Sequence, residues 1–158
     1  LVNEEHLHNK TVLEGFSRGG LFALNWAAQT PDKTGCIYLD APVCDFKSWP
    51  GTNKDFANDW KLLKEAYGFQ SDEEAMQYPY NPVDNLQPLA DHNIPVLSVC
   101  GTEDVLVPIR DNSGLLKKRY EALGGKMTII EKQGIGHHPH SLKDPAPIVQ
   151  FILKERLR

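Results

Sequence analysis

Three residues that can do chemistry stand at equivalent points of a repeating pattern. Ser17 lies in the stretch G-F-S-R-G-G, between an apolar run and a segment rich in helix-forming residues. Asp104 lies in G-T-E-D-V-L-V-P and His137 in G-I-G-H-H, each shortly after another apolar run. A serine hydroxyl is a useful nucleophile only beside a base, and that base needs an acid that orients it. These residue types, in this order, indicate nucleophilic catalysis through an acyl-serine intermediate.

The glycine-rich stretch around Ser17 is typical of a nucleophile elbow, in which G-x-S-x-G joins a strand to a helix. Such a turn strains the serine backbone and lifts the hydroxyl clear of the sheet edge. We expect Gly15 and Gly19 to avoid side chains that would collide with neighbouring backbone. The amide of Arg18 would then point to the position of a substrate oxyanion. The alternative interpretation is that Ser17 only caps the following helix.

Elements that alternate between strand and helix must position these residues. The pattern predicts helices at about 18–29, at 113–123 and from about residue 145 onward. Short apolar strands separated by helices indicate an α/β fold, a parallel sheet with helices on both faces. Its functional side chains belong at the carboxyl ends of the strands. The predicted strands are 11–14, 35–41, 95–100 and 126–131.

Residues 45–93 do not follow this alternation. They contain aromatic residues, prolines and helical pieces at 55–67 and 71–78, the second opened by the capping box S-D-E-E. A long insertion between two strands of a compact sheet is usually a lid or a binding cap. We therefore expect a core formed by 1–44 and 94–158, with a helical cap inserted at 45–93.

The cap also supplies candidates for a substrate pocket, namely Trp49, Phe56 and Trp60, with Tyr67 at the same helical spacing. Aromatic residues at this spacing can instead form the core of the cap. The side chain of Arg18 could bind a substrate carboxylate or form a surface salt bridge.

The elbow, the acid motif and the histidine motif together resemble the α/β-hydrolase superfamily of serine esterases and lipases. The resemblance extends from Thr11 to the final helix. It implies that Ser17 is the nucleophile, Asp104 the acid and His137 the base, with the Arg18 amide as one oxyanion donor. It also implies further strands before the elbow, so we expect residues 1–9 to end a helix and an amino-terminal portion of the fold to be supplied elsewhere.

Alternatives remain for two of these assignments. His138 could replace His137 as the base, and Asp40 or Asp45, at the end of the second strand, could replace Asp104. The cluster H-H-P-H could bind a metal ion, but no acidic or cysteine ligand stands beside it in the sequence, and we expect no metal and no other cofactor.

Composition restricts the partners. The chain of 158 residues has a formal net charge of −4 and no run of basic residues, which argues against nucleic acid as a partner. No apolar run is long enough to span a membrane. Three widely spaced cysteines indicate no disulfide framework, and nothing indicates a compartment.

Two classes of function fit these observations. The first is an enzyme that hydrolyses a carboxylic ester of a small molecule, with a serine peptidase of the prolyl-oligopeptidase type as its nearest rival. The second is a non-catalytic binding protein on the same fold, because a fold does not by itself determine chemistry.

Overall fold

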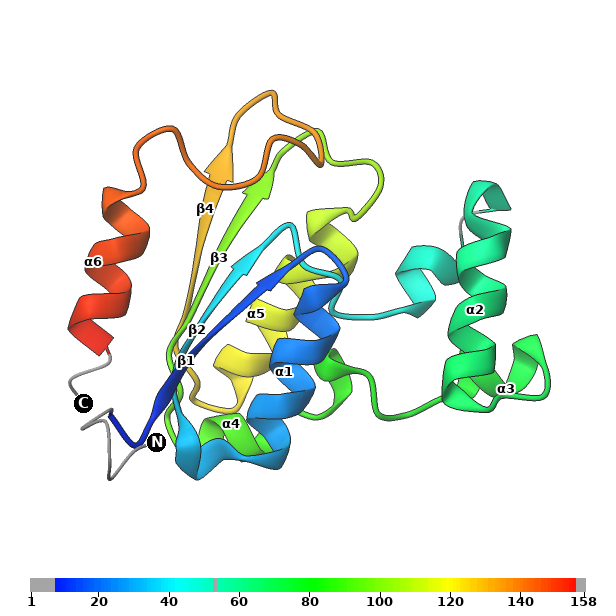
Figure 1. Ribbon diagram of the computed structural model, residues 1–158, viewed down its shortest axis with the longest axis horizontal. Helices are drawn as coiled ribbons and strands as arrows, with labels where there is room; N and C mark the ends of the chain where they lie inside the picture. The colour runs from blue at the N-terminus through cyan, green and yellow to red at the C-terminus, as the bar shows by residue number, and fades with distance from the viewer. Residues whose placement is uncertain (1–7, 53, 156–158) are drawn as a thin grey trace.

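The computed structural model describes residues 8–52 and 54–155 and contains the predicted parallel sheet. Its four strands lie in the order β1-β2-β3-β4, and every neighbouring pair is parallel. All four carboxyl ends therefore meet at one edge of the sheet (Figure 1). The strands are β1 (Thr11–Phe16), β2 (Thr34–Asp40), β3 (Val96–Gly101) and β4 (Met127–Lys132).

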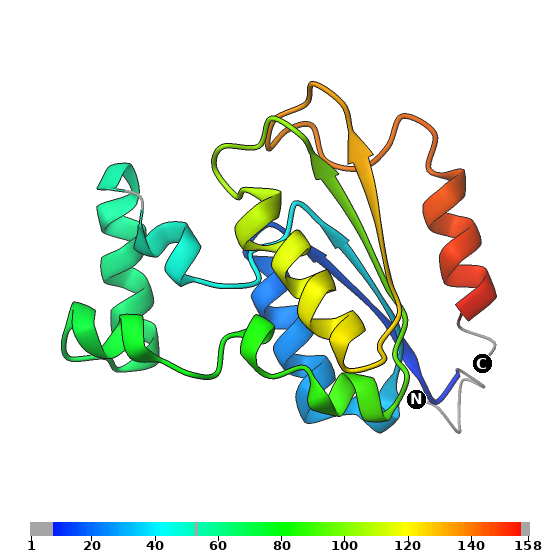
Figure 2. The same cartoon turned by 180° about the vertical axis from the view of Figure 1, so that it is seen from behind.

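Helices cover both faces of this sheet, which confirms the predicted fold class. Helix α6 lies on one face, and α1, α4 and α5 lie on the other (Figures 1 and 2). The main helices are α1 (Gly19–Gln29), α2 (Ala57–Tyr67), α3 (Asp72–Gln77), α4 (Gln87–Asp91), α5 (Ser113–Ala122) and α6 (Ala146–Glu155). Short helical turns are η1 (Pro31–Lys33), η2 (Lys47–Gly51), η3 (Lys54–Phe56), η4 (Pro82–Asp84) and η5 (Ile109–Asp111).

Alternate residues of the buried strands supply two separate hydrophobic clusters. On β2, Ile37 and Leu39 face α1, α4 and α5, whereas Tyr38 faces α6 together with Leu97 of β3. Side chains of a strand point alternately to the two sides of a sheet, so strands covered on both faces are apolar throughout. Continuous apolar runs such as P-V-L-S-V-C have this physical origin.

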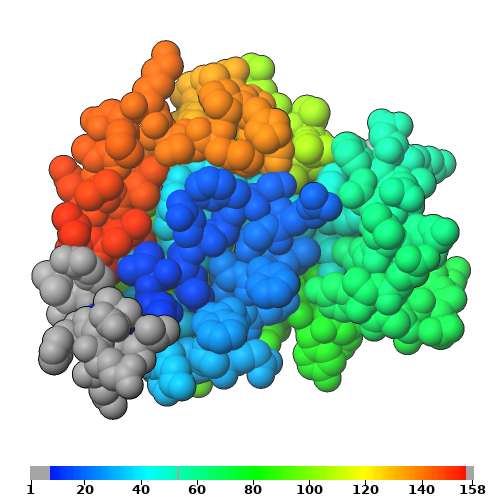
Figure 3. Space-filling model, viewed as in Figure 1, coloured from blue at the N-terminus to red at the C-terminus, as the bar shows by residue number. Residues whose placement is uncertain are grey.

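The segment predicted as a cap divides into two parts in the structure. Helices α2 and α3 form a body beside α1, held by an aromatic cluster around Phe46 (Figures 1 and 3). By contrast, α4 packs in the main core through Leu89 and Ala90. The boundaries at residues 44 and 93 remain a prediction, but the second half of the inserted segment contributes to the core.

The start of α3 follows the capping rule, since the Ser71 hydroxyl accepts a hydrogen bond from the Glu74 amide at 3.1 Å. The expected helix at residues 1–9 falls almost entirely outside the described residues. Among the described residues, no helix has the length and apolar character needed to cross a membrane.

Candidate active site

Ser17 occupies a strained turn at the carboxyl end of β1. Its φ of 47° lies in the left-handed region, which non-glycine residues rarely adopt. Three backbone hydrogen bonds hold the turn, from the Ser17 amide to the Asp40 carbonyl at 2.9 Å and from the Gly20 and Val43 amides to the Ser17 carbonyl at 2.9 and 2.8 Å. The strain is therefore maintained by the neighbouring strand β2 and the loop that follows it.

The glycines of the elbow are only partly as expected. A Cβ at Gly15 would lie 2.7 Å from the Gly19 carbonyl oxygen, so this glycine allows the close approach of helix α1. A Cβ at Gly19 would meet nothing within 4 Å among the described residues, and our expectation for this position is wrong. The second tight position is Gly20, where a Cβ would lie 2.6 Å from Pro42 Cβ. Gly20 lies on the buried side of α1 against the loop that follows β2, which is why the close contact falls at Gly20 and not at Gly19.

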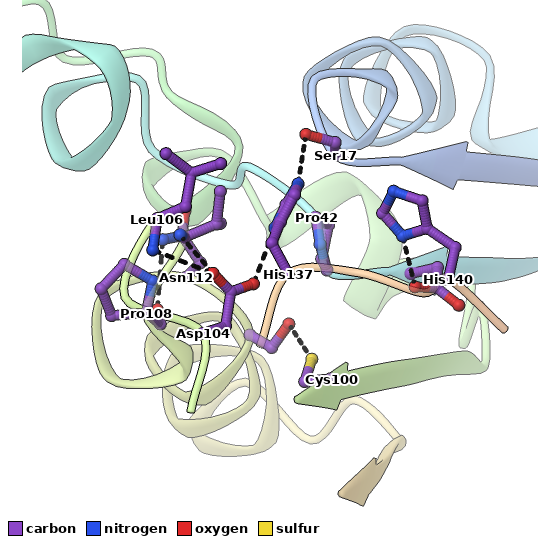
Figure 4. Close-up of polar contacts among 12 residues, drawn as sticks. Ser17, Pro42, Cys100, Asp104, Leu106, Pro108, Asn112, His137 and His140 are labelled. Carbon is purple, nitrogen blue, oxygen red and sulfur yellow. Dashed lines mark hydrogen bonds and ion pairs between the residues drawn. The ribbon is translucent and has the colours of Figure 1, made fainter. Parts of the chain in front are cut away.

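The structure brings Ser17, Asp104 and His137 together at the carboxyl edge of the sheet (Figure 4). His137 Nε2 lies 3.0 Å from Ser17 Oγ, and His137 Nδ1 lies 2.7 Å from Asp104 Oδ2. The two nitrogens of one imidazole thus link a hydroxyl to a carboxylate across 120 and 33 residues of sequence. In this arrangement the imidazole can accept the serine proton while the carboxylate stabilises the resulting cation.

Asp104 is buried and its second oxygen is also occupied. Oδ1 accepts hydrogen bonds from the amides of Leu106 and Val107 at 3.0 and 2.8 Å, so the loop after β3 folds around the carboxylate. These amides compensate the loss of water around a charged group that is only 6% exposed. They also fix the direction in which Oδ2 points.

The alternative acids contact other partners. Asp45 Oδ1 accepts a hydrogen bond from the Lys47 amide, and burial raises the pKa of this carboxyl above its ordinary value. Asp40 is completely buried and bonds to His140, not to His137. The alternative base, His138, is exposed, and its ring stands edge-on to that of His137 at 4.9 Å.

Arg18 follows Ser17 and is the N-cap residue of α1. Its side chain is largely exposed and reaches Asp59 of α2 at 3.5 Å, while the guanidinium lies 5.8 Å from the centre of the Trp49 ring. The side chain therefore joins the elbow to the cap by a surface ion pair.

Of the predicted pocket residues, Trp49 lines a cavity of about 250 Å³ that Arg18 and Leu21 also border. Phe56 packs on Trp49 with ring centres 5.5 Å apart. Trp60 is not among the residues that line this cavity. It packs against Phe46 and donates a hydrogen bond to Asp72, which places it within the cap.

A second carboxylate–imidazole pair lies beside the first, and the sequence did not indicate it. His140 Nδ1 lies 2.8 Å from Asp40 Oδ1, and the His140 ring stacks on Phe16 at 5.4 Å between centres. The sequence offers Asp40 as an alternative acid and His140 as a member of a histidine cluster, with nothing that joins the two. The sequence signal that could have drawn attention to Asp40 is its place at the end of β2, the strand between β1, which leads to Ser17, and β3, which leads to Asp104.

Comparison with known proteins agrees with this fold. The model of the prolyl oligopeptidase family matches residues 1–152. No curated protein matches the chain. Solved structures with the same fold include a puromycin-hydrolysing peptidase from Mycobacterium tuberculosis, with 19% identity and a TM-score of 0.69. The match covers 96% of this chain and 22% of the peptidase.

Two further structures show how widely the fold is shared. Dipeptidyl peptidase 4 from Porphyromonas gingivalis has 16% identity and a TM-score of 0.67, and the match covers 92% of this chain and 19% of that protein. A monoacylglycerol lipase from Paleococcus ferrophilus has 22% identity and a TM-score of 0.60, over 96% of this chain and 71% of the lipase. The chain thus spans about a fifth of the length of these peptidases and most of the lipase.

Proposed function

Because the chain belongs to the prolyl oligopeptidase family, we propose that it carries the active site of a serine hydrolase whose catalytic residues are Ser17, Asp104 and His137. The observation that carries this proposal is the position of His137, with Nε2 3.0 Å from Ser17 Oγ and Nδ1 2.7 Å from Asp104 Oδ2. The strained φ of Ser17 supports it, since such strain is concentrated at functional sites.

The reaction proceeds in two halves. Ser17 Oγ attacks the substrate carbonyl carbon as its proton passes to His137 Nε2, and the Arg18 amide donates a hydrogen bond to the oxyanion. His137 then gives the proton to the leaving group, and an acyl-serine remains. Water, activated by the same imidazole, releases the acid and restores Ser17. Asp104 stays ionised throughout and stabilises the imidazolium.

Among acyl substrates, a peptide bond is the first candidate and a carboxylic ester the second. Family membership favours the peptide, and the cavity beside Trp49 and Arg18 could accept an apolar side chain next to the reacting carbonyl. Similarity to a monoacylglycerol lipase and the ester expected from the sequence keep the second candidate open. The two differ in the leaving group, an amine that needs protonation or an alcohol that needs less assistance.

Labelling with a fluorophosphonate tests the proposal directly, because this probe reacts with an activated serine. We expect the protein to be labelled, and Ser17→Ala to lose both the label and hydrolysis of p-nitrophenyl acetate. Ser71→Ala, which removes a hydroxyl in the cap, is the control and should be labelled normally. Activity of Ser17→Ala within threefold of the unmodified protein would remove Ser17 from the mechanism. Comparing kcat/KM for a blocked peptidyl p-nitroanilide and for the ester then ranks the two substrate classes.

A further inference from the structure

The Asp40–His140 pair fixes an imidazole beside the proposed catalytic base. Asp40 is fully buried at the end of β2, and its Oδ2 accepts hydrogen bonds from the Tyr38 hydroxyl at 2.8 Å and from the Ser141 amide at 2.6 Å. Its Oδ1 holds His140 Nδ1. With Nδ1 engaged, the free nitrogen of His140 is Nε2, which points away from Asp40 on the side of Ser17 and His137 (Figure 4).

Three imidazoles converge at this point. One nitrogen from each of His137, His138 and His140 lies within 4.8 Å of one nitrogen of the other two. Zinc binds imidazole nitrogen at about 2.0–2.1 Å in a tetrahedral site, which sets neighbouring nitrogens about 3.4 Å apart. Closing the widest pair to that separation requires a movement of about 1.4 Å. The side chain of His138 is exposed, and its ring can rotate toward the other two imidazoles.

Two of the three imidazoles already have the partners that metal-bound histidines require. A metal-bound imidazole usually donates its other N–H to a carboxylate, which fixes the ring and raises its basicity. Asp104 does this for His137 and Asp40 does it for His140. These two carboxylates come from the ends of β2 and β3, far from H-H-P-H in the sequence. Neutral imidazoles suit zinc and copper among the divalent ions.

We propose that His137, His138 and His140 form an inhibitory site for a divalent transition metal, with zinc as the first candidate. The ion takes the Nε2 lone pair of His137, which the hydrolytic reaction needs to accept the serine proton. Bound metal and acylation therefore exclude each other. The inhibition rests on the proposed function, whereas the binding rests on the three imidazoles alone.

Co²⁺ and Zn²⁺ test the two parts separately. We expect Co²⁺ to give the visible absorption of a tetrahedral complex, Zn²⁺ to displace it, and Zn²⁺ to stop ester hydrolysis until EDTA is added. His138→Gln should weaken Co²⁺ binding and Zn²⁺ inhibition together, because it removes a ligand, and by at least the roughly 10- to 100-fold that loss of a hydrogen-bonding partner behind a ligand costs. The ring of His138 packs edge-on against His137, but both nitrogens of His137 are held by Asp104 and Ser17 and not by His138. The metal-free rate of this variant should therefore stay within about threefold.

The matched control is His92→Gln, which removes an exposed histidine whose partner among the described residues is the Pro88 carbonyl. Its metal binding should equal that of the unmodified protein. Absence of the Co²⁺ absorption, or equal metal affinity in His138→Gln, overturns the site. Metal binding without inhibition of an active protein overturns the inhibitory role. A protein that binds Co²⁺ through His138 but hydrolyses no substrate supports the metal site and contradicts the proposed function.

Discussion

At the scale of single residues, the two carboxylate oxygens of Asp104 have different hydrogen-bond partners. Oδ1 accepts hydrogen bonds from two backbone amides of its own loop, and these bonds fix the orientation of the carboxylate so that Oδ2 faces His137 Nδ1. In Asp104→Asn the side chain keeps its shape and can still accept from the amides, but it cannot stabilise an imidazolium. We expect kcat to fall by about 10³- to 10⁴-fold with little change in the thermal midpoint. Steady-state kinetics and thermal unfolding followed by circular dichroism measure both quantities.

The other acids provide the controls for this experiment. Asp45→Asn should retain nearly all activity, because Asp45 bonds to the Lys47 amide and not to an imidazole. Asp40→Asn should lower the rate far less than Asp104→Asn, since Asp40 acts on His140. A larger loss in Asp40→Asn or Asp45→Asn would mean that the acid is assigned wrongly.

Site residues that stand in a short sequence motif could be predicted, whereas contacts between residues far apart in the sequence could not. Ser17, Asp104 and His137 each stand in a short motif after a strand, so local reading finds them, and parallel strands bring them to one edge. The pairing of Asp40 with His140 joins residues 100 apart in the sequence and has no motif. The close contact at Gly20 is made by Pro42 and Val43, more than 20 residues away in the sequence, so the elbow motif alone does not distinguish Gly20 from Gly19.

At the scale of elements, the loop that carries His137 crosses the end of β3 at very close range. A Cβ at Gly101 would lie 2.2 Å from the Ile135 carbonyl oxygen and 2.3 Å from that of Gly136. The Glu103 amide bonds to the same Ile135 carbonyl at 2.9 Å, and the Gly134 amide bonds to the Thr102 hydroxyl at 2.9 Å. These contacts fix the position of the loop, and therefore of His137, relative to the end of β3.

We therefore expect Gly101→Ala to displace the histidine loop. A displacement of about 1 Å at a catalytic group can cost about 100-fold in rate, and overpacking should lower the free energy of unfolding by about 1–3 kcal/mol. The measurements are kcat/KM for ester hydrolysis and urea unfolding. The control is Gly35→Ala on β2, where the added methyl meets only ordinary contacts of 3.4 Å or more. Equal activity of the two variants would show that the loop does not depend on this contact.

The elements themselves were predictable where their patterns are strong. Each strand lies within two residues of its predicted limits, because a parallel strand buried on both faces is an apolar run between turn residues. The five-residue helix α4 (Gln87–Asp91) escaped prediction, since it is too short to show a helical period and contains Pro88. Its core contacts through Leu89 come from tertiary packing, not from its own sequence.

At the scale of the whole molecule, the interior encloses several weak acids that are neutral at pH 7. Burial, together with the charge of Glu155, raises the pKa of the Cys36 thiol to about 11 from 9.0. Burial raises the pKa of Tyr120 to about 12, and its hydroxyl lies 3.0 and 2.6 Å from the Leu89 and Ile94 carbonyls. Burial and the bond to Asp40 also raise the pKa of Tyr38. The folded chain thus holds these protons more tightly than the unfolded chain does.

The sign of the resulting pH dependence follows from linkage between proton binding and folding. Below pH 9 both states keep the Cys36 proton, and the full stability is present. Between pH 9 and about 11 the unfolded chain loses this proton first, so the free energy of unfolding falls as pH rises. The loss from Cys36 alone should reach about 1–2 kcal/mol between pH 8 and pH 10.5. Urea unfolding under reducing conditions at these two pH values measures it.

Cys36→Ala separates this titration from packing. The variant should be less stable than the unmodified protein at pH 8, because a buried side chain is shortened and leaves a cavity. Its stability should nevertheless fall less between pH 8 and pH 10.5, by about the 1–2 kcal/mol that the thiol contributes. Comparing the change with pH in each protein cancels the cavity term, which is the same at both pH values. Parallel losses in the two proteins would show that the buried thiol does not govern alkaline unfolding, and the same comparison with Tyr120→Phe would then test the tyrosine.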